Sequence, residues 1–348
     1  MSNKSNTKND NSGNLPLVLI LAICLVILSV LVVLVLQKFK PSEPSVPAVN
    51  TDPQPPQTPQ TIEIPDLQNM NIQGARDILS ELGVEFEIVP TDSKIANRVE
   101  KVEGYTVGEN GKIVVNSNSK ITIHSNEVAK DKVIYLTFDD GPTRDNTDYI
   151  LATLDKYNIK ATFFVEGNDV NIYPQKMQAT FDAGHLIGCH SYSHDFSSIY
   201  NSTDAFIQEV IKYENALKNA LGEERYASVQ KLIRFPGGTD NNTLTKENAL
   251  DYIQAVRELG YRVYDWTCLT GDANPPTPVT DTQGMIDFLN DSISLAKSQG
   301  KPLIALLHDK WPVKENDSLS AIIENLIAQG YYFDTIDNCP EYTSCENK

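Results

Sequence analysis

The chain has 348 residues, of which 41% are hydrophobic and 22% charged, a composition ordinary for globular proteins. That length allows one large domain and a smaller one. The 46 acidic and 29 basic residues give a net charge of -17, which excludes a nucleic-acid-binding protein because phosphate binding needs a basic face.

The first predicted element is the uncharged apolar run at 15–36, whose 22 residues are enough to span a bilayer as a helix. It is long for a signal-peptide core and no small-x-small cleavage site follows, so we expect a retained transmembrane helix. A buried core helix is the alternative, but the run has no polar face. Residues 1–14 would be a cytoplasmic tail. Lysines lie on both sides of the run and do not decide its orientation.

Residues 37–60 contain seven prolines, which disfavour helices and sheets and favour an extended conformation. We expect a Pro-rich linker of roughly 60 Å. A plain disordered tether is the alternative.

Residues 61–126 are predicted to form a small α+β module. Asn71 is a plausible cap for a helix that ends at Gly83, and its apolar residues recur on one face. Strands are expected at 84–88, 113–115 and 121–123. The opening Ile64-Pro65-Asp66, the helix, Gly83 and the closing strands resemble a PASTA domain. That resemblance implies binding to peptidoglycan fragments or a spacer role.

From about residue 131 the pattern changes to strands alternating with helices. Such alternation implies a parallel sheet, and this many units can curl into a barrel. An open doubly wound sheet is the competing architecture, but no nucleotide-binding glycine fingerprint follows the first strand. The predicted strands are 133–138, 161–165, 186–189, 232–235, 262–266, 303–307 and 331–336; the predicted helices include 147–157, 204–221, 246–259 and 285–297.

Clusters of polar residues follow several of these strands. In a parallel barrel the functional residues lie at the carboxyl ends of the strands. Asp139 and Asp140 end the first strand; taken alone, Asp-Asp-Gly is more often a surface turn. His190 and His194 follow the third strand at a spacing that lets both rings bind one metal ion. The pair needs an anionic third ligand, which either aspartate could supply. Two ordinary loop histidines are the alternative.

Two further polar residues occupy strand ends. Arg234 lies within an apolar strand and demands a carboxylate partner, for which Asp139 is a good candidate. His308 ends the strand at 303–307, and its place on the same rim favours a catalytic role over a structural one. His124 and His185 lack such company, so we expect both to be structural.

Together these residues resemble the polysaccharide deacetylase family, also called the NodB-homology family or carbohydrate esterase family 4. The match is expected over 131–338, with a C-terminal tail at 339–348. Five motifs occur in the family's order: Thr137–Pro142, His190–His194, Arg234–Gly238, Trp266–Asp272 and Leu306–Asp309.

The resemblance implies a distorted (β/α) barrel and a divalent metal ion. Asp140, His190 and His194 would hold the metal, with zinc as the first expectation. Cobalt, nickel or manganese could occupy the same geometry.

The resemblance also implies the catalytic groups. Asp139 would be the general base for the attacking water, steadied by Arg234. His308 would protonate the departing amine, oriented by Asp272. A backbone N–H, that of Gly237, would stabilise the oxyanion.

The chain departs from the family pattern at two places in the pocket wall. The third motif often has an aromatic residue where this chain has Gly237, and the fourth often has Trp where it has Ala273. Trp266 could supply aromatic surface instead, although core packing is an equal alternative. The departures put substrate choice in doubt but leave the metal ligands and the acid–base pair in place.

We therefore expect a metal-dependent enzyme that removes acetyl groups from N-acetylglucosamine in peptidoglycan, held in the cell membrane by one helix and facing the wall. In this family that modification typically confers resistance to lysozyme. The alternatives are deacetylation of N-acetylmuramic acid, chitooligosaccharides or acetylated xylan, or a non-catalytic wall-binding protein. Five cysteines are too few for a disulfide scaffold, although Cys339 with Cys345, or Cys189 with Cys268, could pair.

Overall fold

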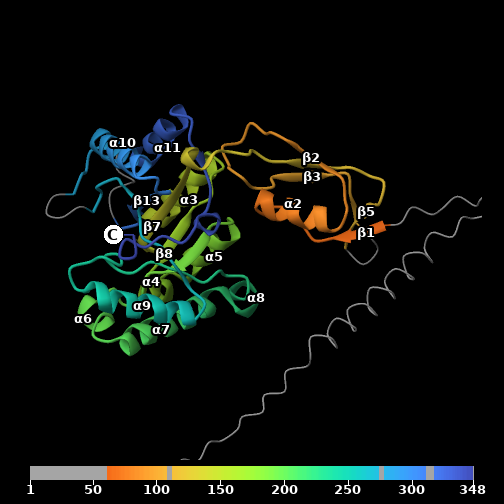
Figure 1. Ribbon diagram of the computed structural model, residues 1–348. Coiled ribbons are helices and arrows are strands. Elements are labelled where there is room, and N and C mark those ends of the chain that lie inside the picture. The colour runs from red at the N-terminus through yellow and green to blue at the C-terminus, as the bar shows by residue number, and fades with distance from the viewer. Residues whose placement is uncertain (1–60, 108–111, 274–277, 311–316, 348) are drawn as a thin grey trace, which may run out of the picture. The chain divides into compact units, whose positions relative to one another are not determined.

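The computed structural model describes residues 61–107, 112–273, 278–310 and 317–347 (Figure 1). They fall within one compact unit, 59–348. The expected anchor at 15–36, the tail before it and the linker at 37–60 lie outside the described residues. No helix among the described residues is long and apolar enough to cross a membrane.

The small module is built from one helix and two three-stranded sheets, β1-β5-β4 and β2-β6-β3. The predicted helix is present, and Asn71 Oδ1 accepts a hydrogen bond from the Gln73 N–H (2.8 Å) at its start. Its buried face packs on β6 through Leu79 and Ile121. The arrangement is α+β as expected, while the likeness to a PASTA domain stays a prediction. The elements are β1 (Thr61–Ile64), α2 (Ile72–Glu81), β2 (Phe86–Val89), β3 (Lys101–Glu103), β4 (Thr106–Val107), β5 (Ile113–Asn116) and β6 (Ile121–His124).

The larger domain contains an eight-stranded parallel sheet in the order β11-β10-β9-β8-β7-β13-β12, with β14 also paired to β7. The sheet curls into a half-barrel, so the expected barrel is open between β11 and β12. All seven predicted strands are found, several of them shorter than expected, and the short β12 was missed. The strands are β7 (Val133–Gly141), β8 (Thr162–Val165), β9 (Leu186–Cys189), β10 (Leu232–Ile233), β11 (Arg262–Val263), β12 (Cys268–Leu269), β13 (Leu303–His308) and β14 (Tyr332–Phe333).

Helices cover the outer face of this sheet (Figure 1). The four helices predicted from periodicity are present as α3, α7, α9 and α10, with ends shifted by up to three residues. The helices are α3 (Asn146–Lys156), α4 (Gly167–Ile172), α5 (Pro174–Asp182), α6 (Phe196–Ile199), α7 (Thr203–Leu221), α8 (Glu223–Tyr226), α9 (Lys246–Glu258), α10 (Thr282–Ser298) and α11 (Ser318–Ala328).

Side chains of β7 alternate between the two faces of the sheet because a strand has a period of two. Ile134 and Phe138 pack outward against the helices, whereas Val133 and Tyr135 point inward. The inner face is buried as well, which explains why the strand is apolar without a break. Asp139 lies on the inner face at the end of this row.

The module is joined to the half-barrel by backbone pairing. Ile95 forms a parallel bridge with Phe333 of β14, through N–H groups of Ala96 and Phe333 (2.9 and 2.8 Å). Arg98 adds ion pairs to Asp334 (2.7 Å) and Asp337 (2.6 Å).

The segment expected to be a C-terminal tail packs against the domain. Tyr342 and Cys345 are buried, and the Tyr342 carbonyl accepts a hydrogen bond from the Asp265 N–H (2.8 Å). The four described cysteines are free and buried, so neither considered pair is joined.

Candidate active site

The first polar cluster lies at the carboxyl end of β7. Asp139 is almost fully buried, and its neighbour Asp140 takes a left-handed backbone conformation (φ 67°). For a residue other than glycine this conformation is uncommon, and such residues gather at functional sites. Gly141 follows where a Cβ would lie 2.5 Å from Asp309, so only glycine lets the strand end this close to its neighbour.

Three side chains converge in front of this strand end. The Nε2 atoms of His190 and His194 lie 3.3 and 3.4 Å from Oδ1 of Asp140. One ligand atom from each residue falls within 4.8 Å of the others. The structure therefore brings together the three residues proposed to bind a metal.

The histidines are oriented by their surroundings. His190 Nδ1 donates a hydrogen bond to the Arg234 carbonyl (2.9 Å), which leaves its Nε2 to face Asp140. Glu209 of α7, buried at 4% exposure, accepts hydrogen bonds from the N–H and hydroxyl of Ser193 (2.8 and 2.7 Å) and so fixes the loop between the two histidines. Glu209 is not among the residues predicted from the sequence; its only signal there is an acidic residue on the apolar face of a helix.

This cluster fits a metal ion. Asp140 Oδ1 is buried without a hydrogen-bond partner in the described structure. Burial lowers the pKa of His194 to about 4, which favours the neutral ring that metal binding requires. One carboxylate and two imidazoles are the donors found in catalytic zinc sites with an open position.

Arg234 is fully buried behind the cluster. Its Nη1 donates to Asp139 Oδ1 (2.8 Å) and to the hydroxyl of Thr137 (2.7 Å), and its Nε donates to the Tyr264 carbonyl (2.9 Å). The guanidinium also lies 4.4 Å from the ring centre of Phe164. The arginine therefore has the carboxylate partner that its place in an apolar strand demanded.

His308 approaches from the other side on β13, paired in register with Asp139. Asp272 accepts hydrogen bonds from its Nδ1 (3.0 Å) and from its backbone N–H (2.8 Å). Burial pulls the pKa of His308 down, but the hydrogen bond and charge of Asp272 outweigh it, so the pKa is raised. A protonated ring is thereby favoured, with Nε2 left to act.

A pocket of about 430 Å³ brings these groups together. All the predicted site residues except the fully buried Arg234 line it. Gly237 lies on its wall at φ 75°, and a Cβ there would come within 3.1 Å of the Phe196 ring. Phe196 therefore occupies space next to the glycine, where many family members have an aromatic residue. Phe196 is not among the residues predicted from the sequence, because only the fold brings the start of α6 beside Gly237.

Comparisons with known proteins identify the family. The sequence profile of the polysaccharide deacetylase family matches residues 126–264. A peptidoglycan-N-acetylglucosamine deacetylase of Bacillus cereus is 27% identical over 252 residues, which cover 72% of this chain and 84% of that protein. A bifunctional xylanase/deacetylase of Pseudobutyrivibrio xylanivorans is 34% identical over 59% of this chain, but the match spans only 30% of that protein.

Among solved structures, a carbohydrate esterase family 4 (CE4) esterase of Streptococcus mutans is 31% identical, with a TM-score of 0.51, over 59% of this chain and 86% of the other. The sequence profile covers the part of the half-barrel that carries Asp139, Asp140, His190, His194 and Arg234, and it ends before Asp272 and His308. The chain belongs to the polysaccharide deacetylase family, carbohydrate esterase family 4, and is a hydrolytic deacetylase.

Proposed function

We propose that this chain removes the acetyl group from N-acetylglucosamine residues of peptidoglycan in a metal-dependent reaction. The observation that carries the proposal is one pocket in which the Asp140, His190 and His194 cluster lies between a buried carboxylate and a carboxylate-bound histidine. Amide hydrolysis needs two proton transfers, and Asp139 and His308, which are paired on neighbouring strands, can each serve one of them.

Asp140, His190 and His194 would hold the metal, with zinc expected first and cobalt, nickel or manganese as alternatives. Such an ion supplies Lewis-acid chemistry, polarising a carbonyl and lowering the pKa of water. The remaining steps belong to side chains of this chain.

Asp139 would take the proton from the water whose oxygen attacks the acetamide carbon. Its Oδ1 is occupied by Arg234 at 2.8 Å, so Oδ2 is the atom left to receive the proton. The hydrogen bond from the guanidinium fixes the orientation of this carboxylate. The N–H of Gly237 would donate a hydrogen bond to the oxyanion, since this residue lines the pocket.

His308 would give its proton to the sugar nitrogen as the C–N bond breaks, releasing acetate and a free amine. Asp272 orients the ring through Nδ1 and stabilises its positive charge. Base and acid thus act from adjacent strands, β7 and β13.

N-acetylglucosamine of peptidoglycan is supported by the name of the relative that matches over 72% of this chain. Phe196 and Trp266, which line the pocket, would offer apolar faces to a sugar ring. Acetylated xylan is a second candidate, favoured by the xylanase/deacetylase at 34% identity. N-acetylmuramic acid and chitooligosaccharides use the same reaction.

The proposal includes placement at the cell wall. The apolar run at 15–36 would hold the chain in the membrane, the linker at 37–60 would extend from it, and the module at 61–126 would have a PASTA-like wall-binding or spacer role. Removing acetyl groups there would make the wall resistant to lysozyme.

The test is acetate release by the full chain from purified peptidoglycan and, separately, from N-acetylglucosamine oligomers and acetylated xylan, each with zinc or with chelator. We expect acetate from peptidoglycan that chelator and Asp140→Ala both abolish. Mass spectrometry of the digest then names the deacetylated sugar. Release from xylan alone would overturn the substrate assignment, and no release from any glycan would favour a non-catalytic wall-binding protein.

A further inference from the structure

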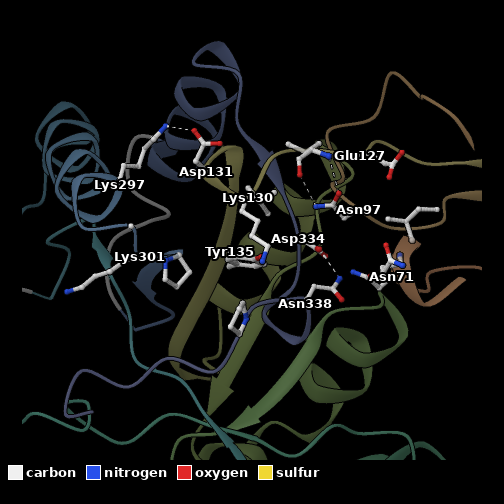
Figure 2. A pocket seen from close by; sticks show the side chains of 17 residues that line it. Asn71, Asn97, Glu127, Lys130, Asp131, Tyr135, Lys297, Lys301, Asp334 and Asn338 are labelled. Atoms are coloured by element: carbon white, nitrogen blue, oxygen red, sulfur yellow. Dashed lines mark hydrogen bonds and ion pairs between the residues drawn. The ribbon is translucent and has the colours of Figure 1, made fainter. Parts of the chain in front are cut away.

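A second pocket, of about 620 Å³, lies where the module meets the half-barrel (Figure 2). We call it the junction pocket. Asn71 and Asn97 line it from the module, and Lys130, Tyr135 and Asn338 line it from the half-barrel. It has no lining residue in common with the catalytic pocket of about 430 Å³.

The two pockets lie at opposite ends of β7. Tyr135, Thr137 and Asp139 are successive inward-facing residues of that strand, so Tyr135 and Asp139 are separated by about 13 Å at 3.3 Å per residue. Arg234 is fully buried and donates hydrogen bonds to both Thr137 and Asp139. A ligand in the junction pocket therefore cannot be the group undergoing reaction.

Tyr135 is the feature that points to a ligand. The residue is only 9% exposed, and its hydroxyl makes no hydrogen bond to any residue that the structure describes. Burial raises the pKa of this phenol, so it remains a neutral donor and acceptor. A hydroxyl on a pocket wall, carried by a largely buried tyrosine, forms its hydrogen bond when a polar ligand or water occupies the pocket. Figure 2 shows Tyr135 among the side chains that line the pocket, together with Asp334 and Asn338.

Most of the charged side chains that line the pocket are paired within the chain, which favours a ligand with little net charge. Glu127 is paired with Arg76 (2.7 Å), and Asp334 is paired with Arg98 (2.7 Å). Lys297 lies 3.5 Å from Asp131 (Figure 2). These four lining charges already have partners inside the chain, so they offer no strong site for a polyanion or a polycation. Lys130 and Lys301 also line the pocket, and the described residues give neither an ion pair. Their ammonium groups can donate hydrogen bonds to the hydroxyl and acetamide oxygens of a sugar.

The uncharged part of the pocket lining matches the chemical groups of a sugar. Asn338 lines the pocket and donates to Asp334 Oδ2 (2.8 Å) through its amide nitrogen, which leaves its side-chain carbonyl oxygen as an acceptor. Val128 and Pro302 add apolar surface to the wall. Sugars combine hydroxyl and acetamide groups with apolar C–H faces, and neutral amides, a phenol and aliphatic surface match both.

We propose that the junction pocket binds a saccharide segment of the acetylated glycan at a site separate from the catalytic pocket. The choice of an acetylated glycan rests on the proposed function, whereas the saccharide chemistry rests on the lining. Holding the polymer at a second site raises the effective concentration of its other sugars at the catalytic pocket.

The test uses the full chain carrying Asp140→Ala, so that binding is measured without turnover. N-acetylglucosamine oligomers are titrated by calorimetry, and hydrogen exchange locates the bound sugar. We expect protection at 128–135 and 334–340. Tyr135→Phe removes one hydrogen-bonding group and should weaken this binding about three- to tenfold.

Tyr105→Phe is the matched control, because this tyrosine of the module is 39% exposed and outside the pocket. It should leave binding unchanged. Lys130→Ala, at an exposed position on the rim, gives a second test should Tyr135→Phe fail to fold. We expect it to weaken binding as well.

Oligomers that protect neither segment, or that bind equally well to the variants and the control, would overturn the proposal. So would a sugar-free peptidoglycan stem peptide that protects both segments where the oligomers do not. If the chain binds the saccharide but releases no acetate from any glycan, the proposed function is wrong and the proposal for the junction pocket still holds.

Discussion

Nη1 of Arg234 lies 2.8 Å from Oδ1 of Asp139, and the two side chains are among the most buried charged groups of the chain. Such a pair costs free energy to desolvate, so its presence beside the Asp140, His190 and His194 cluster favours a role in holding the Asp139 carboxylate in place. The stability and the activity of the protein are therefore linked at this pair.

Arg234→Met should lower the free energy of unfolding by about 3–5 kcal/mol, because it leaves Asp139 buried without its partner. It should also lower kcat, since the carboxylate then loses its fixed orientation. Urea unfolding and acetate release measure the two effects.

Two controls distinguish the effect of an unpaired buried charge from an unspecific loss of stability. Adding Asp139→Asn to Arg234→Met removes the unpaired charge and should recover part of the lost stability. Arg257→Met breaks exposed ion pairs to Glu341 and Glu346 and should cost less than about 1 kcal/mol. Equal losses for the two arginine variants would contradict the assigned role of Arg234.

The acid and the metal ligands are distinguished by two histidine variants. His308→Ala should keep the bound metal and lose about 10²–10⁴-fold in kcat, because it removes only the proton donor. His190→Ala should lose both metal and activity. Elemental analysis of the purified variants, beside their acetate release, gives the answer. Loss of metal from His308→Ala would show that the separation of ligand and acid is wrong.

Phe196 is expected to bind substrate rather than take part in the chemistry. Its ring packs edge-on against His194 (5.6 Å) and lines the pocket. Phe196→Ala should raise KM about tenfold with a smaller change in kcat, as expected when uniform binding is lost. Phe196→Tyr retains the ring and is the matched control. A fall in kcat without a change in KM would instead indicate that the ring positions His194.

The module should contribute to the stability of the half-barrel. Arg98→Ala leaves Asp334, with a side-chain exposure of 1%, without its cation and should cost about 2–4 kcal/mol. Arg76→Ala breaks an exposed pair with Glu127 and is the control, expected to cost less than about 1 kcal/mol. Thermal unfolding of both variants measures the difference. Equal midpoints would show that the contact between the module and the half-barrel adds little.

His185 should make the fold sensitive to mild acid. Burial lowers its pKa to about 3 from 6.5, and its Nδ1 accepts the Ala161 N–H (3.2 Å). Above pH 6.5 the His185 ring is neutral in both the folded and the unfolded chain. Below that pH the unfolded chain takes up a proton that the folded chain refuses, so stability falls by about 1.4 kcal/mol per pH unit until the folded pKa is reached.

The measurement is urea unfolding at pH 7.5 and pH 5 for the unaltered chain and for His185→Gln. The variant should lose less stability between the two pH values, by roughly 2 kcal/mol. Parallel losses would mean that other groups cause the acid sensitivity.

Much of the half-barrel could be predicted from the sequence, because the hydrophobic pattern of most segments matches the strand or helix that they form. The continuous apolar run of β7 and the periodicity of α7 are strong signals, and both elements were found. The two-residue strand β12 was missed, since a segment that short carries no period. The closure of the barrel was overestimated because sheet curvature depends on strand pairing, which the sequence does not display.

At the site, the sequence by itself determined which residues are candidates: residue type and position at strand ends named Asp139, Asp140, His190, His194 and His308, and the structure places all five in one pocket. Only the tertiary structure decided what surrounds them. Glu209 behind the histidine loop, Phe196 beside Gly237 and the junction pocket under Tyr135 all arise from segments distant in the chain. Parallel strands align their carboxyl ends by a general rule, so strand-end residues can be anticipated, whereas contacts from helices and from a second module depend on packing that no local pattern encodes.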